Sequence, residues 1–360
     1  MHIGVFYFRR DLRIHDNSAL HKLCTICDVI VPIFCFDPRQ VNVKKNAYYS
    51  NLSVRFMLES LQDLDRYITK NTKKASLNLF YGLPEKSIFY IVETLFKHHK
   101  ATHVTVGWNE DNTPFALSRD QKIKKYLQKK YKPEQLSVHT NSHDVTIVPV
   151  RDIRTNGGAK YQQFKQFYKK ALAKGVKFPK KLPTTVFLSP SVWSSKLEVL
   201  SVSSLWKHKL FKHLVNTHAC VAGGRTEALK RLTTQYIQSR CSNYNIERNY
   251  TWEEKTTRLS AYFKFGCISF REAYHAVIKA LNNNHVACEA LTREFFWNAF
   301  YSYVSYCFPY VLAGQLNGFT KTKKKRINLE MQVKLQNTMN TFWKENTAKH
   351  LQRLPSLILE

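Results

Sequence analysis

Acidic residues are scarce in this chain of 360 residues, which has 26 Asp and Glu against 56 Lys and Arg and a formal net charge of +30. A surplus of this size predicts a polyanionic partner, and nucleic acid is the commonest polyanion that proteins bind. A lysine-rich surface without such a partner would have the same composition, because composition does not place charge on one face. The charge by itself leaves both interpretations open.

Long hydrophobic runs and paired cysteines are also missing. The apolar run HIGVFYF near the N-terminus is too short to span a membrane, and it lacks the basic start and cleavage site of a signal peptide. The eight cysteines are scattered, which predicts reduced thiols and a cytosolic or nuclear compartment. Cys24 and Cys27 form a CxxC without a second ligand pair, so a zinc site is not predicted.

The first half of the chain alternates short apolar runs with helical stretches. Apolar runs of this kind predict strands that are buried on both faces, and their alternation with helices predicts a doubly wound parallel sheet. The predicted strands are 3–8, 29–36, 77–81, 103–108 and 136–140, and the predicted helices are 16–23, 51–69, 85–98 and 114–130. The turn after the first strand reads FRRDLR without GxGxxG, which disfavours a conventional NAD-binding site.

The second half of the chain has a different pattern. Residues 150–203 are rich in Pro, Lys and Ser and are interpreted as a connector with one helix at 161–174. Beyond them, apolar residues recur at three- and four-residue spacing and predict helices at 228–238, 271–281 and 287–300. The expected domains are therefore 1–149 (α/β), 150–203 (connector) and 204–360 (all-α).

A cluster of hydroxyls and one arginine stands out in the helical part: Thr256, Thr257, Arg258, Leu259 and Ser260. At the start of a helix, such donors together with the helix dipole suit a diphosphate. Ser and Thr at a helix start are more often ordinary N-caps, so this cluster alone does not decide between the two roles.

Several motifs stand in one order along the chain. The segment from Tyr244 reads YNIERNYTWEEKTTRLSAYFKFGCISFREAY, with GRTEAL before it and EALTREF after it from Glu289. In the first half, NEDNTPFALSRD begins at Asn109 and follows the opening HIGVFYFRRDLR. Together these motifs resemble the DNA photolyase/cryptochrome family, and the resemblance covers residues 3 to about 308.

The resemblance implies FAD as the cofactor and an α/β antenna-binding domain followed by a helical flavin domain. It implies FAD contacts by Tyr244, Thr256, Thr257, Arg258, Leu259, Ser260 and Arg293, and contacts with damaged DNA by Arg248, Glu289 and Thr292. Asn109 and Glu110 would touch an antenna chromophore, a folate or a deazaflavin.

The implied activity is that of a deoxyribodipyrimidine photolyase, in which reduced FAD, excited by blue light, donates an electron that splits a pyrimidine dimer in extruded DNA bases. A cryptochrome-like photoreceptor without repair activity is the alternative, and a flavin-free fragment is the third interpretation.

Two departures from the family pattern bear on activity. Thr292 replaces the tryptophan of the family's ELxWREF motif, an aromatic platform for the lesion, so the resemblance predicts that Thr292→Trp strengthens binding of lesion DNA. From Trp343 the chain resembles the start of a later family block and then loses it. We therefore expect a C-terminally truncated helical domain, from a frameshift, an early stop or a split gene, and weak FAD binding unless a separately encoded chain supplies the remaining helices.

Overall fold

The computed structural model describes residues 1–71, 75–142, 144–217, 219, 221–250 and 252–313. The family block expected from Trp343 lies outside the described residues, as does the C-terminal part of the predicted all-α domain.

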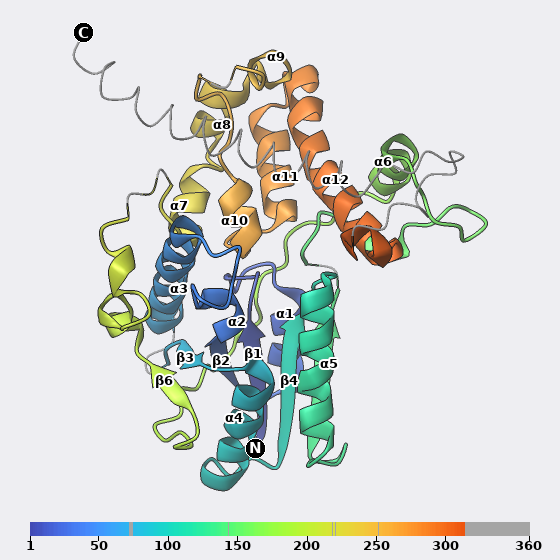
Figure 1. Ribbon diagram of the computed structural model, residues 1–360. Coiled ribbons are helices and arrows are strands. Elements are labelled where there is room, and N and C mark those ends of the chain that lie inside the picture. Colours follow the sequence, from blue (N-terminus) through green and yellow to red (C-terminus); the bar gives the residue numbers. More distant parts are fainter. Residues whose placement is uncertain (72–74, 143, 218, 220, 251, 314–360) are drawn as a thin grey trace. The chain divides into compact units, whose positions relative to one another are not determined.

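A six-stranded sheet forms the centre of the N-terminal part, with strand order β5-β4-β1-β2-β3-β6 (Figure 1). The first five strands of the chain pair in parallel, and β6 pairs with β3 in the antiparallel direction. The strands are β1 (His2–Phe8), β2 (Val29–Phe36), β3 (Asn78–Tyr81), β4 (His103–Asn109), β5 (Leu136–Asn141) and β6 (Glu198–Leu200). The predicted parallel α/β sheet is thus confirmed.

Helices cover both faces of this sheet, because alternate residues of each central strand are apolar on either side. On one face, Val5, Ile33 and Val106 pack under α4 and α5. On the other face, Phe6, Phe8 and Phe34 pack under α1 and α3. The helices of this part are α1 (Ser18–Ile26), α2 (Pro38–Val41), α3 (Asn51–Asn71), α4 (Pro84–His98) and α5 (Pro114–Gln128).

The remaining described chain comprises the connector and, beyond it, a part that is mostly helical, as predicted. Its longest helix, α12, carries eleven buried residues on more than one side and lies beside α11 (Figure 1). Its helices are α6 (Phe164–Ala173), α7 (Arg225–Lys230), α8 (Thr234–Cys241), α9 (Tyr244–Glu247), α10 (Ser260–Phe265), α11 (Phe270–Ala280) and α12 (His285–Cys307). Short 3-10 turns lie at Val150–Asp152, Val202–Lys207, Lys212–Leu214 and Pro309–Ala313.

Local hydrogen bonding corrects three of the predicted elements. The helix predicted at 228–238 is two helices, because Thr233 caps the start of α8 by accepting a hydrogen bond from the Tyr236 amide. The first helix begins at Ser18 and not at residue 16, because Asn17 is its N-cap. The predicted connector also contributes a strand, β6, whose side chains have no clear apolar alternation.

The helical part is attached to the α/β part at the turn that follows β1. The amide of Leu12 donates to the carbonyl of Phe265 at 3.0 Å. Arg271 of α11 forms ion pairs with Asp16 and Asp144, each at 2.9 Å, and all three side chains are buried. Within the described chain, no helix is both long enough and apolar enough to cross a membrane.

Candidate functional site

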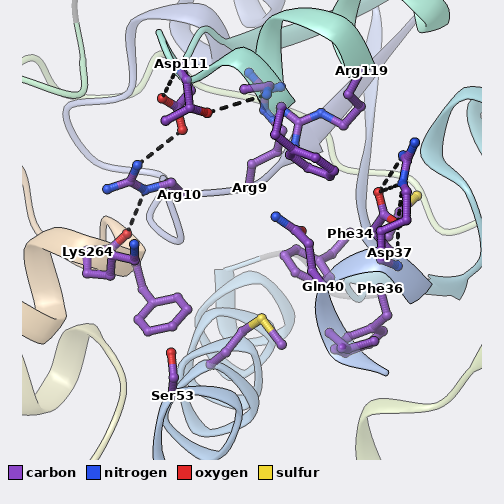
Figure 2. Close-up of a pocket in the computed structure, with 18 of the residues that line it drawn as sticks. Arg9, Arg10, Phe34, Phe36, Asp37, Gln40, Ser53, Asp111, Arg119 and Lys264 are labelled. Carbon is purple, nitrogen blue, oxygen red and sulfur yellow. Dashed lines mark hydrogen bonds and ion pairs between the residues drawn. The ribbon is translucent and has the colours of Figure 1, made fainter. Parts of the chain in front are cut away.

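A cavity of about 810 Å³ lies at the carboxyl edge of the parallel sheet, and we call it the sheet-edge cavity (Figure 2). Its wall includes Arg9 and Arg10 after β1, Asp37 after β2 and Asn109 at the end of β4. The strand order reverses between β1 and β4, and the crevice beyond the carboxyl ends of strands at such a point is the usual ligand site of doubly wound sheets. Fold topology therefore explains why these polar residues meet.

Two arginines of the sheet-edge cavity share one buried carboxylate. Arg9 and Arg119 bind Asp120 at 2.5 and 3.0 Å, and the Trp108 indole donates to the same carboxylate at 3.0 Å. Both guanidinium groups also lie over the ring of Tyr7, at 5.6 and 5.8 Å from its centroid. This arrangement fixes cationic groups beside an aromatic ring, a surface suited to a planar anionic ligand.

Asn109 and Glu110 were both predicted to contact an antenna chromophore, and only Asn109 lines the sheet-edge cavity. Asn109 lines the sheet-edge cavity, but its amide nitrogen donates to Asp11 and Asn17 at 2.6 and 2.8 Å. Burial raises the pKa of Asp11, and the hydrogen bonds from the Arg9 amide and Asn109 only partly offset it. Glu110 is bound by Arg151 at 2.7 Å and is not among the lining residues.

Arg10, Asp111 and Lys264 belong to the sheet-edge cavity and also to a second cavity. Arg10 binds Asp111 at 3.1 Å and donates to the Lys264 carbonyl at 3.1 Å, as Figure 2 shows. The charge of Arg10, followed by burial, lowers the pKa of Lys264. Two cations held this closely would be stabilised by an anionic ligand group between the cavities.

The second cavity, of about 590 Å³, is lined mainly by α10 and α12, and we call it the helical cavity. It brings together Tyr244, Thr257, Leu259 and Ser260, four of the residues predicted to contact FAD. One face of α12 supplies the opposite wall, with apolar residues at one end and polar residues at the other: Leu291, Glu294, Phe295, Asn298, Tyr301, Ser302 and Ser305.

The hydroxyls of Thr257 and Ser260 do not cap a helix. The N-cap of α10 is Leu259, which makes no side-chain capping bond, and Ser260 is the first helical residue. Neither hydroxyl has a hydrogen-bond partner among the described residues; Thr257 is buried and Ser260 is exposed, and both line the cavity. The apolar part of the same wall includes Phe263 and Phe270, whose rings stack at 4.0 Å. Free hydroxyls beside stacked rings fit a cofactor that joins phosphates to an aromatic group.

The rim of the helical cavity carries Tyr244 and an ion pair. Burial and then the charge of Glu294 raise the pKa of Tyr244 to about 12, so its phenol remains a hydrogen-bond donor at neutral pH. Arg248, predicted to face DNA, binds Glu294 at 2.7 Å with both side chains about two-fifths exposed. It is therefore accessible to a phosphate, although a carboxylate already competes for it.

Four other predicted residues do not line either cavity: Thr256, Arg258, Glu289 and Arg293. Arg258 has a φ of 49° and binds Glu254 at 2.6 Å. Arg293 lies over the rings of Phe164 and Tyr168 in α6, at 5.6 and 5.8 Å. The helical period places residues 289 and 293 on one side of α12 and residues 291, 294 and 298 on another. Contacts by these four residues remain predictions.

Thr292 is buried within α12 and lines neither cavity. Its hydroxyl donates to the carbonyls of Cys288 and Glu289 at 2.8 and 3.3 Å. The sequence-based expectation that Thr292→Trp strengthens lesion binding therefore lacks the exposed position that it requires.

We expect Thr292→Trp to destabilise the protein by about 1–3 kcal/mol, because the indole would overfill a packed position. Urea unfolding followed by circular dichroism measures this, with Thr292→Ser as the control that keeps the hydroxyl. An unchanged unfolding midpoint together with tighter binding of lesion DNA would restore the original expectation.

Sequence reasoning missed Arg9, Lys264 and Asn298 as site residues, and it included Arg119 only as part of the motif NEDNTPFALSRD. The position of Arg9 directly after a buried strand could have indicated it, because side chains at that point reach the ligand crevice. No comparable signal existed for Asn298, since only the packing of α12 decides which of its faces meets α10.

A doubly wound sheet with a ligand-sized cavity at its switch point is joined to helices that line a second cavity, and this two-part arrangement defines the class of fold. The chain belongs to the DNA photolyase family, whose model matches residues 4–186. This confirms the resemblance drawn from the motifs.

Known relatives extend the similarity beyond the sheet. A (6-4)DNA photolyase of Arabidopsis thaliana is 24% identical, over 95% of this chain and 60% of its own. Cryptochrome-2 of Gallus gallus is 29% identical, over 83% of this chain and 50% of its own. The solved archaeal photolyase of Sulfolobus tokodaii, described with two FAD molecules, has a TM-score of 0.64 and 27% identity over 86% of this chain and 60% of its own. The chain thus spans half to about three-fifths of the length of these relatives.

Proposed function

We propose that the chain binds FAD in the helical cavity and acts in light-driven repair of pyrimidine dimers in DNA. The observation that carries this proposal is the pair of unpartnered hydroxyls, Thr257 and Ser260, that line a cavity of about 590 Å³ beside stacked aromatic rings. Its volume falls in the usual range of cofactor sites, roughly 300–1,000 Å³.

Different residues of the helical cavity would bind different parts of FAD. Thr257 and Ser260 would donate to the diphosphate, with Tyr244 donating from the rim and Lys264 adding positive charge. Phe263, Phe270 and Phe295 would hold apolar surface and exclude water. FAD when bound supplies the light-absorbing and electron-donating chemistry, and the protein supplies orientation and a dry environment.

DNA is the expected partner. A net charge of +30 favours a polyanion, and several relatives are named as photolyases. Arg248 would contact a DNA phosphate after leaving Glu294, which costs little because exposed ion pairs contribute only about 0–1 kcal/mol. Thr256, Arg258, Glu289 and Arg293 are kept as secondary candidates for cofactor and DNA contacts.

The sheet-edge cavity is proposed to hold a second, light-harvesting chromophore. Its aromatic and guanidinium groups suit a planar anionic molecule such as a deazaflavin, a folate or a second flavin. The Sulfolobus tokodaii relative, described with two FAD molecules that imply a novel light-harvesting cofactor, supports this assignment by analogy.

We expect Thr257→Val/Ser260→Ala to weaken FAD binding by about 100-fold or more. Hydrogen bonds to charged groups contribute about 1.5–3 kcal/mol each, and this double variant removes two. Titration of the purified chain with FAD, followed by flavin fluorescence, measures the affinity without any assay of repair. The titration is repeated after adding the product of any adjacent downstream reading frame, because a split gene is one of the three origins considered above.

Thr234→Val/Ser239→Ala on α8 is the matched control, because it makes the same chemical change at two exposed positions. Equal FAD affinity in both double variants would overturn the assignment of the helical cavity. A folded chain that binds no FAD under either condition would favour the flavin-free interpretation.

A light sensor without repair activity is the second candidate function. It is favoured by the identity of residue 292, because a threonine stands there in place of the tryptophan of the family's ELxWREF motif. Photoreduction of a bound flavin combined with equal affinity for damaged and undamaged DNA would support the sensor.

A further inference from the structure

We propose that a groove between α4 and α5 binds single-stranded nucleic acid. The groove, of about 550 Å³, is lined by Lys86, Phe89, Tyr90, Tyr126, Lys129 and Lys130, and we call it the α4–α5 groove. None of these residues lines the sheet-edge cavity or the helical cavity, so the inference does not rest on the proposed flavin site.

The aromatic residues of the groove lie outside the hydrophobic core. The inner sides of the two helices supply Ile88, Ile91, Ile123 and Leu127, which are fully buried against the sheet. Helical spacing turns Phe89, Tyr90 and Tyr126 toward the groove. The Tyr126 side chain is 41% exposed, so ring surface remains accessible there.

Two rings of the groove, Phe89 and Tyr90, contact each other at a centroid distance of 5.4 Å. Phe89 also lies 6.2 Å from Tyr131, which stacks on Phe96 at 5.1 Å, but these two rings pack against the hydrophobic core and do not line the groove. Partly exposed rings in a groove are surfaces on which unpaired bases stack, contributing about 1–3 kcal/mol per base in known cases.

Lysines surround these rings, with little acidic charge to neutralise them. Residues 121–133, at the end of α5 and beyond, contain six lysines and no acidic residue. No acidic residue in the described part of the chain lines the groove, and Lys130 pairs with the neighbouring Glu93 at 2.5 Å. Lys86 and Lys129 form no ion pair with the described residues, so both are available to phosphates.

Charge and rings are interleaved at close range. The ammonium of Lys130 lies 5.3 Å from the Phe89 centroid and 5.7 Å from that of Tyr131. On the neighbouring side, Lys196 lies 5.0 Å from the Tyr90 centroid. Because Lys130 and Lys196 lie over Phe89 and Tyr90, the exposed Tyr126 offers its ring to a base, and the neighbouring lysines can bind the adjoining phosphates.

A single strand fits these features better than the other polyanions. Duplex DNA hides the faces of its bases, so it would use the lysines but not the rings. An acidic peptide would likewise leave the rings without stacking partners. The proposal therefore commits to unpaired bases.

Fluorescence anisotropy of the purified chain with a labelled oligothymidylate of about 20 nucleotides tests the proposal, since known single-strand sites cover about 4–16 nucleotides. Undamaged DNA without added flavin separates this site from the proposed repair site. Because the assay contains neither flavin nor a lesion, failure of the flavin proposal would not affect this result.

Two groove variants separate charge from stacking. Lys86→Gln/Lys129→Gln is expected to lower affinity and to reduce the slope of log K against log salt by about 1.4, which is about 0.7 for each lost phosphate contact. Tyr126→Ala is expected to lower affinity by about 5- to 100-fold with the salt slope unchanged, and Tyr126→Phe is expected to keep most of the affinity.

Lys207→Gln/Lys212→Gln is the control for charge, because both lysines are exposed elsewhere on the chain and form no ion pair with the described residues. Equal effects of the two lysine pairs would overturn the proposal, as would wild-type affinity of Tyr126→Ala. Stronger competition by duplex DNA or by phosphatidylserine vesicles than by unlabelled single strand would overturn it as well.

Discussion

Replacing Gly266 with alanine is expected to destabilise the protein by about 2–5 kcal/mol. Gly266 ends α10 with a left-handed φ of 65°, a conformation that costs other residues about 1–2 kcal/mol. A methyl group there would also lie 2.1 Å from the carbonyl oxygen of Arg10 and 2.6 Å from the Cα of Asp11. These neighbours are backbone atoms that cannot rotate away, so we add an overpacking cost of about 1–3 kcal/mol. Urea unfolding measures the total.

Gly158→Ala is the matched control for this substitution. Gly158 also has a positive φ, of 77°, but no atom lies within 4 Å of the methyl group that alanine would add. We therefore expect only the conformational cost of about 1–2 kcal/mol. If the two variants lost the same free energy of unfolding, the close approach of α10 to the turn after β1 would contribute nothing to stability.

The second large effect is expected for Arg271→Met, which removes the buried cation between Asp16 and Asp144. Arg271 binds both carboxylates at 2.9 Å, and neither Asp side chain is exposed. Removing one partner of a buried ion pair leaves an uncompensated charge and typically costs about 3–5 kcal/mol. Arg66→Met is the control, because Arg66 is 75% exposed in its pair with Asp63 and exposed pairs contribute about 0–1 kcal/mol.

The ion pairs of Arg271 with Asp16 and Asp144 also make the stability loss of Arg271→Met depend on pH. Burial alone would raise the pKa of Asp16, but the hydrogen bonds and charge of Arg271 outweigh it and hold that pKa below its usual value. A lowered folded-state pKa contributes stability above the unfolded-state pKa of about 3.9, and this contribution is lost as the pH falls through the folded-state pKa. The stability difference between wild type and Arg271→Met should therefore be largest near neutral pH and shrink below about pH 4. A difference that does not change with pH would contradict the role of Asp16.

The contacts of Gly266 and Arg271 hold the turn after β1 against the helical part. Gly266 and Arg271 flank the start of α11, and both contact the segment 10–16 that follows β1. The same segment carries Arg10, which lines both cavities. Substitutions at this junction should therefore also weaken ligand binding, through displacement of Arg10 and Lys264.

The candidate site was only partly readable from sequence. Tyr244, Thr257, Leu259 and Ser260 were predicted from their motif, and packing brings them together in the helical cavity. Glu289, Thr292 and Arg293 came from an equally clear motif and line neither cavity. Residues that are adjacent in a sequence motif point to different sides of a helix. Only the packing of α12 decides which of those sides lines a cavity.

By itself, the sequence determined the five parallel strands and the family, whereas the antiparallel β6 was not predicted. Apolar runs of five to eight residues between helical stretches leave few ways to bury both faces of a strand, so local pattern was sufficient there. Tertiary structure alone decided that Arg9 and Arg119 share Asp120, that Lys264 stands between two cavities, and that lysines and rings meet across α4 and α5. Each of these depends on contacts between residues far apart in the chain, whose meeting is set by the packing of whole elements and not by any local period.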